Sequence, residues 1–153
     1  MERGFFEHVL DAFEGFIGDS HGTLHASAHR RGLKVWFGVA DGSAAKEHYE
    51  AQLIRVDGDV ALEIGYHAEY RSPPDNTAAL DRLLSVESQW RDVLGDEAEA
   101  GPFIAMSDWK RISEVWPPPD PEDPETPMDI AGRLADYVDA IEPLRMSHTE
   151  GND

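Results

Sequence analysis

The sequence predicts an α+β fold, in which a mainly antiparallel sheet carries three helices on its apolar face, and three observations lead to it. Apolar residues recur at three- and four-residue steps near both ends of the chain, as they do in amphipathic helices. Between these segments, apolar and polar residues alternate around short turn sequences, as they do in strands. The length of 153 residues is typical of a single domain. The expected order is α-ββββ-α-β-α, a four-stranded meander plus a fifth strand.

The first helix is expected over residues 5–17, where the apolar positions form one stripe. A hairpin is then predicted over residues 24–39, with its turn at Arg31-Gly32 and one apolar surface. Its opposite surface would carry the polar side chains and one tryptophan: His25, Ser27, His29, Lys34 and Trp36. A loop over residues 40–43 would join this hairpin to the next one.

The second hairpin is predicted from its turn. The pair Asp57-Gly58 is a strong signal for a two-residue turn. With this turn, one face of the hairpin collects the apolar side chains Tyr49, Ala51, Leu53, Leu62, Ile64 and Tyr66. The other face places His48 opposite His67. A turn one residue longer would mix polar and apolar side chains on each face, so the two-residue turn is preferred.

Three further elements follow. A second helix is predicted over residues 77–94, because its leucines recur at helical steps and Gly95 follows them. A fifth strand is predicted over residues 103–116, with a bulge or bend around residues 108–110 where the alternation breaks. A third helix is predicted from Pro127 to about residue 141, since its apolar stripe ends there.

Residues 117–127 contain six prolines and four acidic residues, a composition that favours a stiff, extended connector without regular structure. This connector would carry the last helix back across the sheet. The domain is expected to span residues 1–146, and residues 147–153 to form a disordered tail.

The polar face of the second hairpin carries the main candidate site. His48 and His67 would face each other, and Glu50 and Glu69 each lie two residues further along on the same face. Two imidazoles and a carboxylate can hold zinc, iron or manganese. No compact motif such as His-Glu-x-x-His accompanies them, and a solvated strand face is the alternative interpretation. The carboxylates favour the charged imidazoles and the facing ring disfavours them, so the direction of the pKa shift stays open.

A second candidate surface lies on the first hairpin. Trp36, His25 and His29 are predicted interface residues, because an aromatic side chain on a polar sheet face is typical of a contact surface. The alternative is that another segment of the chain covers the tryptophan. The turn beside them holds the main group of basic side chains, either a solvated hairpin tip or a site for a carboxylate or phosphate: Arg30, Arg31 and Lys34.

Composition excludes several classes of function. With 31 acidic and 13 basic side chains, the net charge of −18 repels phosphate backbones, so no nucleic-acid partner is expected. The absence of cysteine excludes thiol nucleophiles, disulfides and cysteine-ligated metals. No apolar run is long enough to span a membrane and no signal-peptide pattern begins the chain, so we expect a cytoplasmic protein without a membrane partner. The serines lack a nucleophile-elbow context, and no catalytic residue is identified.

Two architectures resemble the expected order of elements. Restriction-endonuclease-like folds need a lysine next to their acidic residues, and the corresponding positions here read Glu50-Ala51-Gln52 and Glu63-Ile64-Gly65. Small acidic secretion chaperones, which are dimers that bind unfolded segments, resemble the chain in architecture and charge alone.

At the level of sequence, the chain resembles an uncharacterised family of small acidic bacterial proteins of actinobacterial type. The segments that carry the resemblance include residues 32–38, 48–53 and 62–67. The resemblance implies no activity. We therefore expect a non-catalytic binding domain that forms a homodimer through its polar sheet face and has a protein or peptide as a further partner. This function needs no cofactor. The alternative is a metal-dependent enzyme or metal sensor that uses His48 and His67 together with Glu50 or Glu69.

Overall fold

The computed structural model describes residues 4–38, 46–104 and 106–151, with side chains described up to Arg145. The α+β class is confirmed, with four helices and six strands in this part of the chain rather than three helices and five strands. The elements follow in this order: α1 (Gly4–Ile17), β1 (Leu24–His29), β2 (Gly32–Phe37), β3 (Glu47–Val56), β4 (Asp59–Ala68), α2 (Pro73–Leu84), α3 (Glu87–Leu94), β5 (Glu99–Pro102), β6 (Lys110–Trp116) and α4 (Thr126–Gly151).

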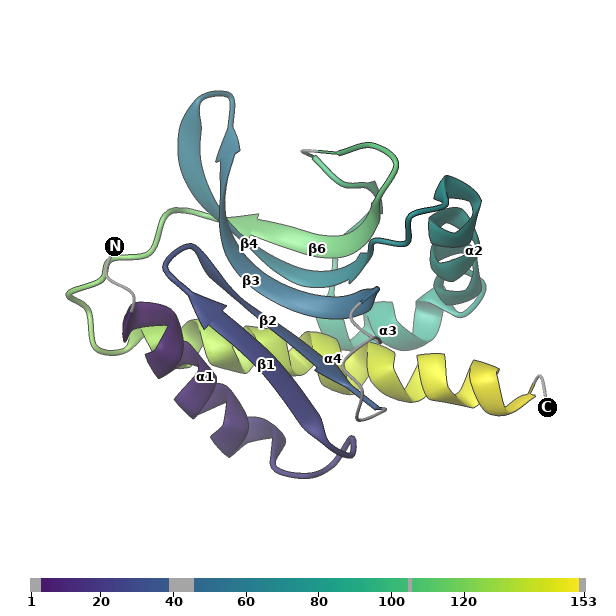
Figure 1. Ribbon diagram of the computed structural model, residues 1–153, viewed down its shortest axis with the longest axis horizontal. Coiled ribbons are helices and arrows are strands. Elements are labelled where there is room, and N and C mark those ends of the chain that lie inside the picture. Colours follow the sequence, from purple (N-terminus) through teal and green to yellow (C-terminus); the bar gives the residue numbers. More distant parts are fainter. Residues whose placement is uncertain (1–3, 39–45, 105, 152–153) are drawn as a thin grey trace.

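The strands form one antiparallel sheet in the order β1-β2-β3-β4-β6-β5. Helix α4 passes behind this sheet in Figure 1 and packs against α1, β3 and β4. Helix α3 packs against α4, and α2 contacts α4, β4 and β6. The apolar core lies between the helices and the sheet, and its fully buried side chains include Phe6, Phe13, Ile64, Tyr66 and Ile130. None of the described helices is long and apolar enough to cross a membrane.

The register predicted for the second hairpin is confirmed. Asp57 and Gly58 form the turn between β3 and β4, both with positive φ, as this type of turn requires. Tyr49 faces Tyr66. Five of the six apolar side chains predicted to share a face are almost inaccessible, and the sixth, Leu53, is partly buried.

The register predicted for the first hairpin is wrong by two residues. The turn lies at Arg30 and Arg31, so Ala28 faces Leu33. Gly32 is the first residue of β2, where a Cβ would lie only 2.9 Å from the Cβ of Gln52 on β3. The glycine therefore allows two strands to approach closely and is not part of the turn. A shift of two residues keeps every side chain on its predicted face. The predicted loop over residues 40–43 lies outside the described residues.

The region after β4 contains elements that the sequence pattern did not reveal. The helix predicted over residues 77–94 is divided at Ser85 and Val86 into α2 and α3. The indole N–H of Trp90 donates to the carbonyl of Leu83 across this break, at 2.8 Å. The short strand β5 follows, and the predicted fifth strand is reduced to β6, because β5 ends at Pro102 and β6 begins only at Lys110.

The last helix extends further than its apolar stripe. Helix α4 begins at Thr126 and continues past residue 147 to Gly151, with Pro143 in its interior. The preceding residues, 117–125, have no regular structure, as predicted. The end near residue 141 was misplaced because the following turns are held by polar contacts. Glu142 accepts a hydrogen bond from the hydroxyl of Tyr49 at 2.8 Å, and Arg145 pairs with Glu142 at 3.1 Å.

Candidate metal centre

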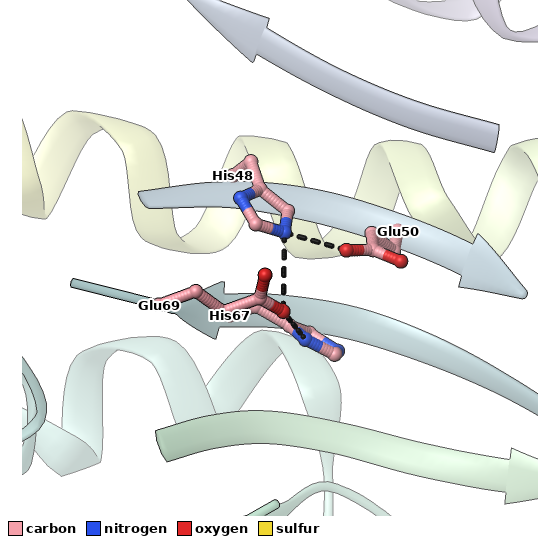
Figure 2. A group of neighbouring side chains, drawn as sticks. All are labelled: His48, Glu50, His67 and Glu69. Carbon is pink, nitrogen blue, oxygen red and sulfur yellow. Dashed lines mark hydrogen bonds and ion pairs between the residues drawn. The ribbon is translucent and has the colours of Figure 1, made fainter. Parts of the chain in front are cut away.

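The face of the sheet turned away from α4 brings together the side chains that the sequence singled out. His48 on β3 lies directly opposite His67 on β4, and their ring centroids are 5.6 Å apart with the planes 27° from parallel. Glu50 lies on β3, and Glu69 directly follows β4. Figure 2 shows the four side chains turned toward one another in front of their strands, with α4 behind.

We call His48, Glu50, His67 and Glu69 the His/Glu cluster. Nε2 of His48 lies 2.6 Å from Oε1 of Glu50 and 3.5 Å from Oε2 of Glu69. The same Oε2 atom of Glu69 lies 2.9 Å from Nδ1 of His67. One nitrogen or oxygen atom from each residue therefore belongs to a group in which all atoms are within 4.8 Å of one another.

Glu63 adds a carboxylate that the sequence analysis did not assign to the site. Its Oε2 atom lies 2.7 Å from Nε2 of His67, and its Oε1 atom accepts a hydrogen bond from Nε2 of Gln52 at 3.0 Å. The signal was present in the sequence, because Glu63 and His67 are four positions apart on one strand and so share a face. Glu63 thus holds one ring nitrogen of His67 and leaves Nδ1 directed into the His/Glu cluster.

Gly65 lies at a close approach between β4 and β6. It lies midway between Glu63 and His67 on β4 and faces Ser113 of β6. A Cβ at position 65 would lie 2.3 Å from the carbonyl oxygen of Ile112 on β6. Its φ of 156° also favours glycine. The absent side chain therefore lets the backbones of β4 and β6 approach each other closely.

The cluster is not the solvated strand face that served as the alternative interpretation. The side chains of His48, His67 and Glu63 have no exposed surface, and those of Glu50 and Glu69 are only 11% and 14% exposed. The ring of Phe103, from the connection between β5 and β6, lies 4.9 Å from that of His67 and is itself buried. A segment distant in sequence therefore helps to cover the hairpin.

Charge in the cluster favours protonated imidazoles. Burial opposes the charged form of His67, but Glu63 and Glu69 outweigh it and raise its pKa to about 10. The pKa of His48 is also raised, since burial is outweighed by the hydrogen bonds with Glu50 and Glu69. In turn, despite its burial, the two histidines hold the pKa of Glu69 well below its usual range. Protons on the imidazoles thus hold the carboxylates together, and a cation in their midst would take over that role.

The predicted interface residues lie beside this cluster rather than in it. His25 stacks on Trp36 with ring centroids 5.7 Å apart, and both side chains are partly buried. Nε2 of His25 and Nε1 of Trp36 are buried without a hydrogen-bond partner among the described residues. His29 is exposed at the hairpin tip, where its Nδ1 accepts a hydrogen bond from the backbone of Arg31 at 3.3 Å.

Two further polar groups face the helices, and the sequence analysis missed both. Glu114 on β6 accepts a hydrogen bond from the hydroxyl of Tyr137 and pairs with Arg133 of α4 at 2.8 Å. Glu47, at the start of β3, accepts hydrogen bonds from the hydroxyls of Tyr66 and Tyr70. Glu47 also lies 3.6 Å from the guanidinium of Arg145 on α4. Both carboxylates therefore contact α4, and we interpret them as polar contacts that dock this helix on the sheet.

No protein-family model, curated protein or solved structure matches the chain. The resemblance to small acidic proteins of actinobacterial type stays a prediction. Function is inferred from the geometry of the His/Glu cluster and of the sheet that carries it.

Proposed function

We propose that the chain binds a divalent transition-metal ion, with Zn²⁺ the best match, through His48, Glu50, His67 and Glu69. The observation that carries the proposal is how His67 uses its two ring nitrogens. Nε2 lies 2.7 Å from the buried carboxylate of Glu63, and Nδ1 is directed toward Glu69. Metal-ligating histidines almost always donate the other ring N–H to a carboxylate or carbonyl in this way, which fixes the tautomer and the ring orientation.

The donor set fits this class of ion. Two imidazole nitrogens and two carboxylate oxygens are ligands for Zn²⁺, Fe²⁺ and Mn²⁺. Two carboxylates with two neutral imidazoles carry a charge of −2, which balances the ion. Ligands bound tetrahedrally at 2.0–2.2 Å lie about 3.3–3.6 Å apart, whereas pairs in the cluster range from 2.6 to 3.5 Å and the group extends to 4.8 Å. Small rotations of these side chains would therefore suffice.

The enclosure of the cluster favours a structural or sensing role over catalysis. Catalytic zinc sites keep one position open for water or substrate, whereas structural sites are closed by four protein ligands. Here four residues supply the ligands, and both histidines are completely buried. Of the two metal-dependent functions considered from the sequence, the metal sensor is the better supported.

Thermal unfolding of untagged protein with added Zn²⁺ or Mn²⁺ tests the proposal. An ion that binds the folded chain but not the unfolded chain stabilises the fold by about 2.7 kcal/mol when its concentration is about 100 times its Kd. This should raise Tm by roughly 5–10 °C. The variant His48→Gln/Glu50→Gln removes two ligands that neutralise each other, so the pair His67–Glu63 stays balanced. It should lose the increment in Tm.

Two controls make the result specific. The variant His29→Gln/Glu99→Gln makes the same chemical change at two exposed positions on the sheet and should keep the full increment. Glu63→Gln keeps all four ligands and should weaken binding 10- to 100-fold, as loss of a supporting carboxylate typically does. The proposal is wrong if the wild-type Tm is unchanged by the metals, or if the rise persists in His48→Gln/Glu50→Gln.

A non-catalytic interaction domain is the second candidate function, and the pair His25–Trp36 favours it. Two ring nitrogens without partners, on a partly exposed aromatic pair, are unusual for a surface that contacts only water. If this pair contacts a partner, Trp36→Phe should weaken the association, and the loss is measurable by sedimentation. Unchanged self-association in Trp36→Phe would remove the sheet face as the contact surface.

A further inference from the structure

Strand β1 forms one edge of the sheet and lacks the features that normally prevent pairing with another chain. Its six residues include no Asp, Glu, Lys, Arg or Pro, and among the described strands only β2 pairs with it. Ala26 and Ser27 are exposed. Figure 1 shows β1 as the outermost strand of the sheet. Natural edge strands are usually short, charged, interrupted by proline or covered by a helix. Helix α1 contacts β1, but the middle of the strand stays exposed at Ala26 and Ser27, so a further strand could pair there.

The opposite edge is protected. Strand β5 has four residues, and these include Glu99 and Pro102. A proline cannot donate a hydrogen bond to a neighbouring strand, and a charge on an edge opposes burial against one. The difference matters in a chain of which 29% of the residues are charged, because the uncharged edge is the exception.

The two ends of β1 carry opposite charges. At the turn into β2, the exposed side chains of Arg30 and Arg31 form no ion pair with the described residues. At the other end, Asp19 precedes the strand, is exposed, and is likewise unpaired within the described part of the chain. Asp139 of α4 lies close by through its contact with His21 and is 58% exposed. A strand that runs antiparallel to β1 and carries the same charges would meet opposite charge at each end.

We propose that two copies of the chain pair antiparallel along β1 and join their sheets into one. A two-fold axis presents the same strand from both copies, and facing residues must project to the same side of the sheet. A two-fold axis that passes through Ala26 satisfies this condition. In that arrangement Leu24 of one copy faces Ala28 of the other, and Arg30 of one copy lies beside residues 19–22 of the other. The basic turn of each copy then lies next to the acidic end of the other, and this contact forms twice.

This interface differs from the one expected from the sequence. His25 and His29 belong to β1 and so take part, but the contact runs along the edge of the sheet and not across its polar face. It does not involve the His/Glu cluster. An edge of six residues buries less than the ~1,600 Å² of a standard interface. We therefore expect a weak dimer with a Kd in the micromolar range.

Sedimentation of two variants, in each of which one alanine is replaced by lysine, tests the pairing. Ala26→Lys puts a charge on the exposed edge, as natural proteins do, and should leave a 17.0 kDa monomer where the wild type sediments at twice that mass. Ala78→Lys makes the same change in charge at an exposed position on α2 and should dimerise as the wild type does. Equal Tm values for both variants at a concentration where the protein is monomeric would show that the fold is retained.

Charge reversal tests the orientation. Arg30→Glu/Arg31→Glu should weaken the dimer about tenfold by placing like charges at both ends, and addition of Asp19→Arg should restore part of the loss. A wild type that stays monomeric up to about 100 µM, where an interface of this size should associate, would overturn the proposal. So would an Ala26→Lys variant that dimerises like the wild type, which would place the contact on another surface. Dimers lost in Ala26→Lys but insensitive to the charge changes would refute the antiparallel arrangement.

Discussion

The pKa of His67 is raised to about 10, so without a bound metal ion its imidazole is charged at neutral pH and is held by two carboxylates. Removing one member of a buried ion pair leaves a charge without compensation and typically costs about 3–5 kcal/mol. Glu63 and His67 are both completely buried, so single changes at either position combine a loss of contact with a stranded charge. The ligands of the proposed metal site are therefore best removed as the balanced pair His48 and Glu50, whose loss leaves the other pair intact.

Two leucines of the second hairpin should respond differently to truncation. Leu62 is completely buried beneath the helices, whereas Leu53, which faces it, is only partly buried. Leu62→Ala should lower the free energy of unfolding by about 2–5 kcal/mol, through lost transfer energy and a cavity. Leu53→Ala should cost clearly less, because it already contacts water. Urea denaturation of both variants measures the difference, and equal losses would contradict the burial described for the two positions.

Helix α4 is docked on the sheet by polar as well as apolar contacts. Glu114 of β6 is 7% exposed and binds Arg133 and Tyr137 on the inner side of the helix. Burial alone would raise the pKa of Glu114, but the hydrogen bonds from Arg133, Tyr137 and Trp116 outweigh it and lower the pKa. The carboxylate form is thus favoured in the folded state, and the docking of α4 depends on its ionisation.

This dependence predicts how stability responds to acid. A pKa lowered by folding contributes stability above the unfolded value of about 4.5, and that contribution is lost as pH falls through the folded pKa. Glu114→Gln should lower the free energy of unfolding at pH 7 by about 1.5–3 kcal/mol, as expected for hydrogen bonds to a charged group. The difference from wild type should shrink below pH 4. Glu97→Gln, which changes an exposed carboxylate near the same arginine, is the control and should alter stability little.

The elements that the sequence predicted well are those whose structure depends on local signals. The turn at Asp57 and Gly58, with the alternation around it, was sufficient for the complete register of β3 and β4. The first hairpin was displaced because Gly32 was assigned to a turn, while its actual role is a close approach to another strand, which local sequence does not show. The end of α4 depends in the same way on partners distant in the chain, such as Tyr49.

In the candidate site, too, the features set by local sequence were predictable and those set by distant segments were not. His48, Glu50, His67 and Glu69 could be grouped from the register of one hairpin, and the structure places them together. The burial of the cluster could not be predicted, because Phe103 reaches it from a connection more than thirty residues away. The upward shift in the pKa of both histidines depends on that enclosure and on Glu63, so the sequence left its direction open.

The net charge of −18 acts on the molecule as a whole. Many of the basic side chains are already paired within the fold, including Arg91 with Glu87, Arg111 with Glu99 and Arg133 with Glu114. Such a field concentrates cations near the surface and repels phosphate backbones. It supports the proposed metal binding. Arg30 and Arg31, at the tip of the first hairpin, form no ion pair with the described residues and place positive charge at one end of the β1 edge.

The short stretch of chain that contains the whole cluster has a consequence for folding kinetics. The proposed ligands and Glu63 lie within residues 48–69, on two strands joined by a two-residue turn and on the residue that follows the second strand. A hairpin of this kind forms in about 1–10 µs, before contacts between distant segments. Added Zn²⁺ should therefore speed refolding in stopped-flow experiments and change the unfolding rate little. Slower unfolding with unchanged refolding would mean instead that the ion is captured only once Phe103 has closed over the hairpin.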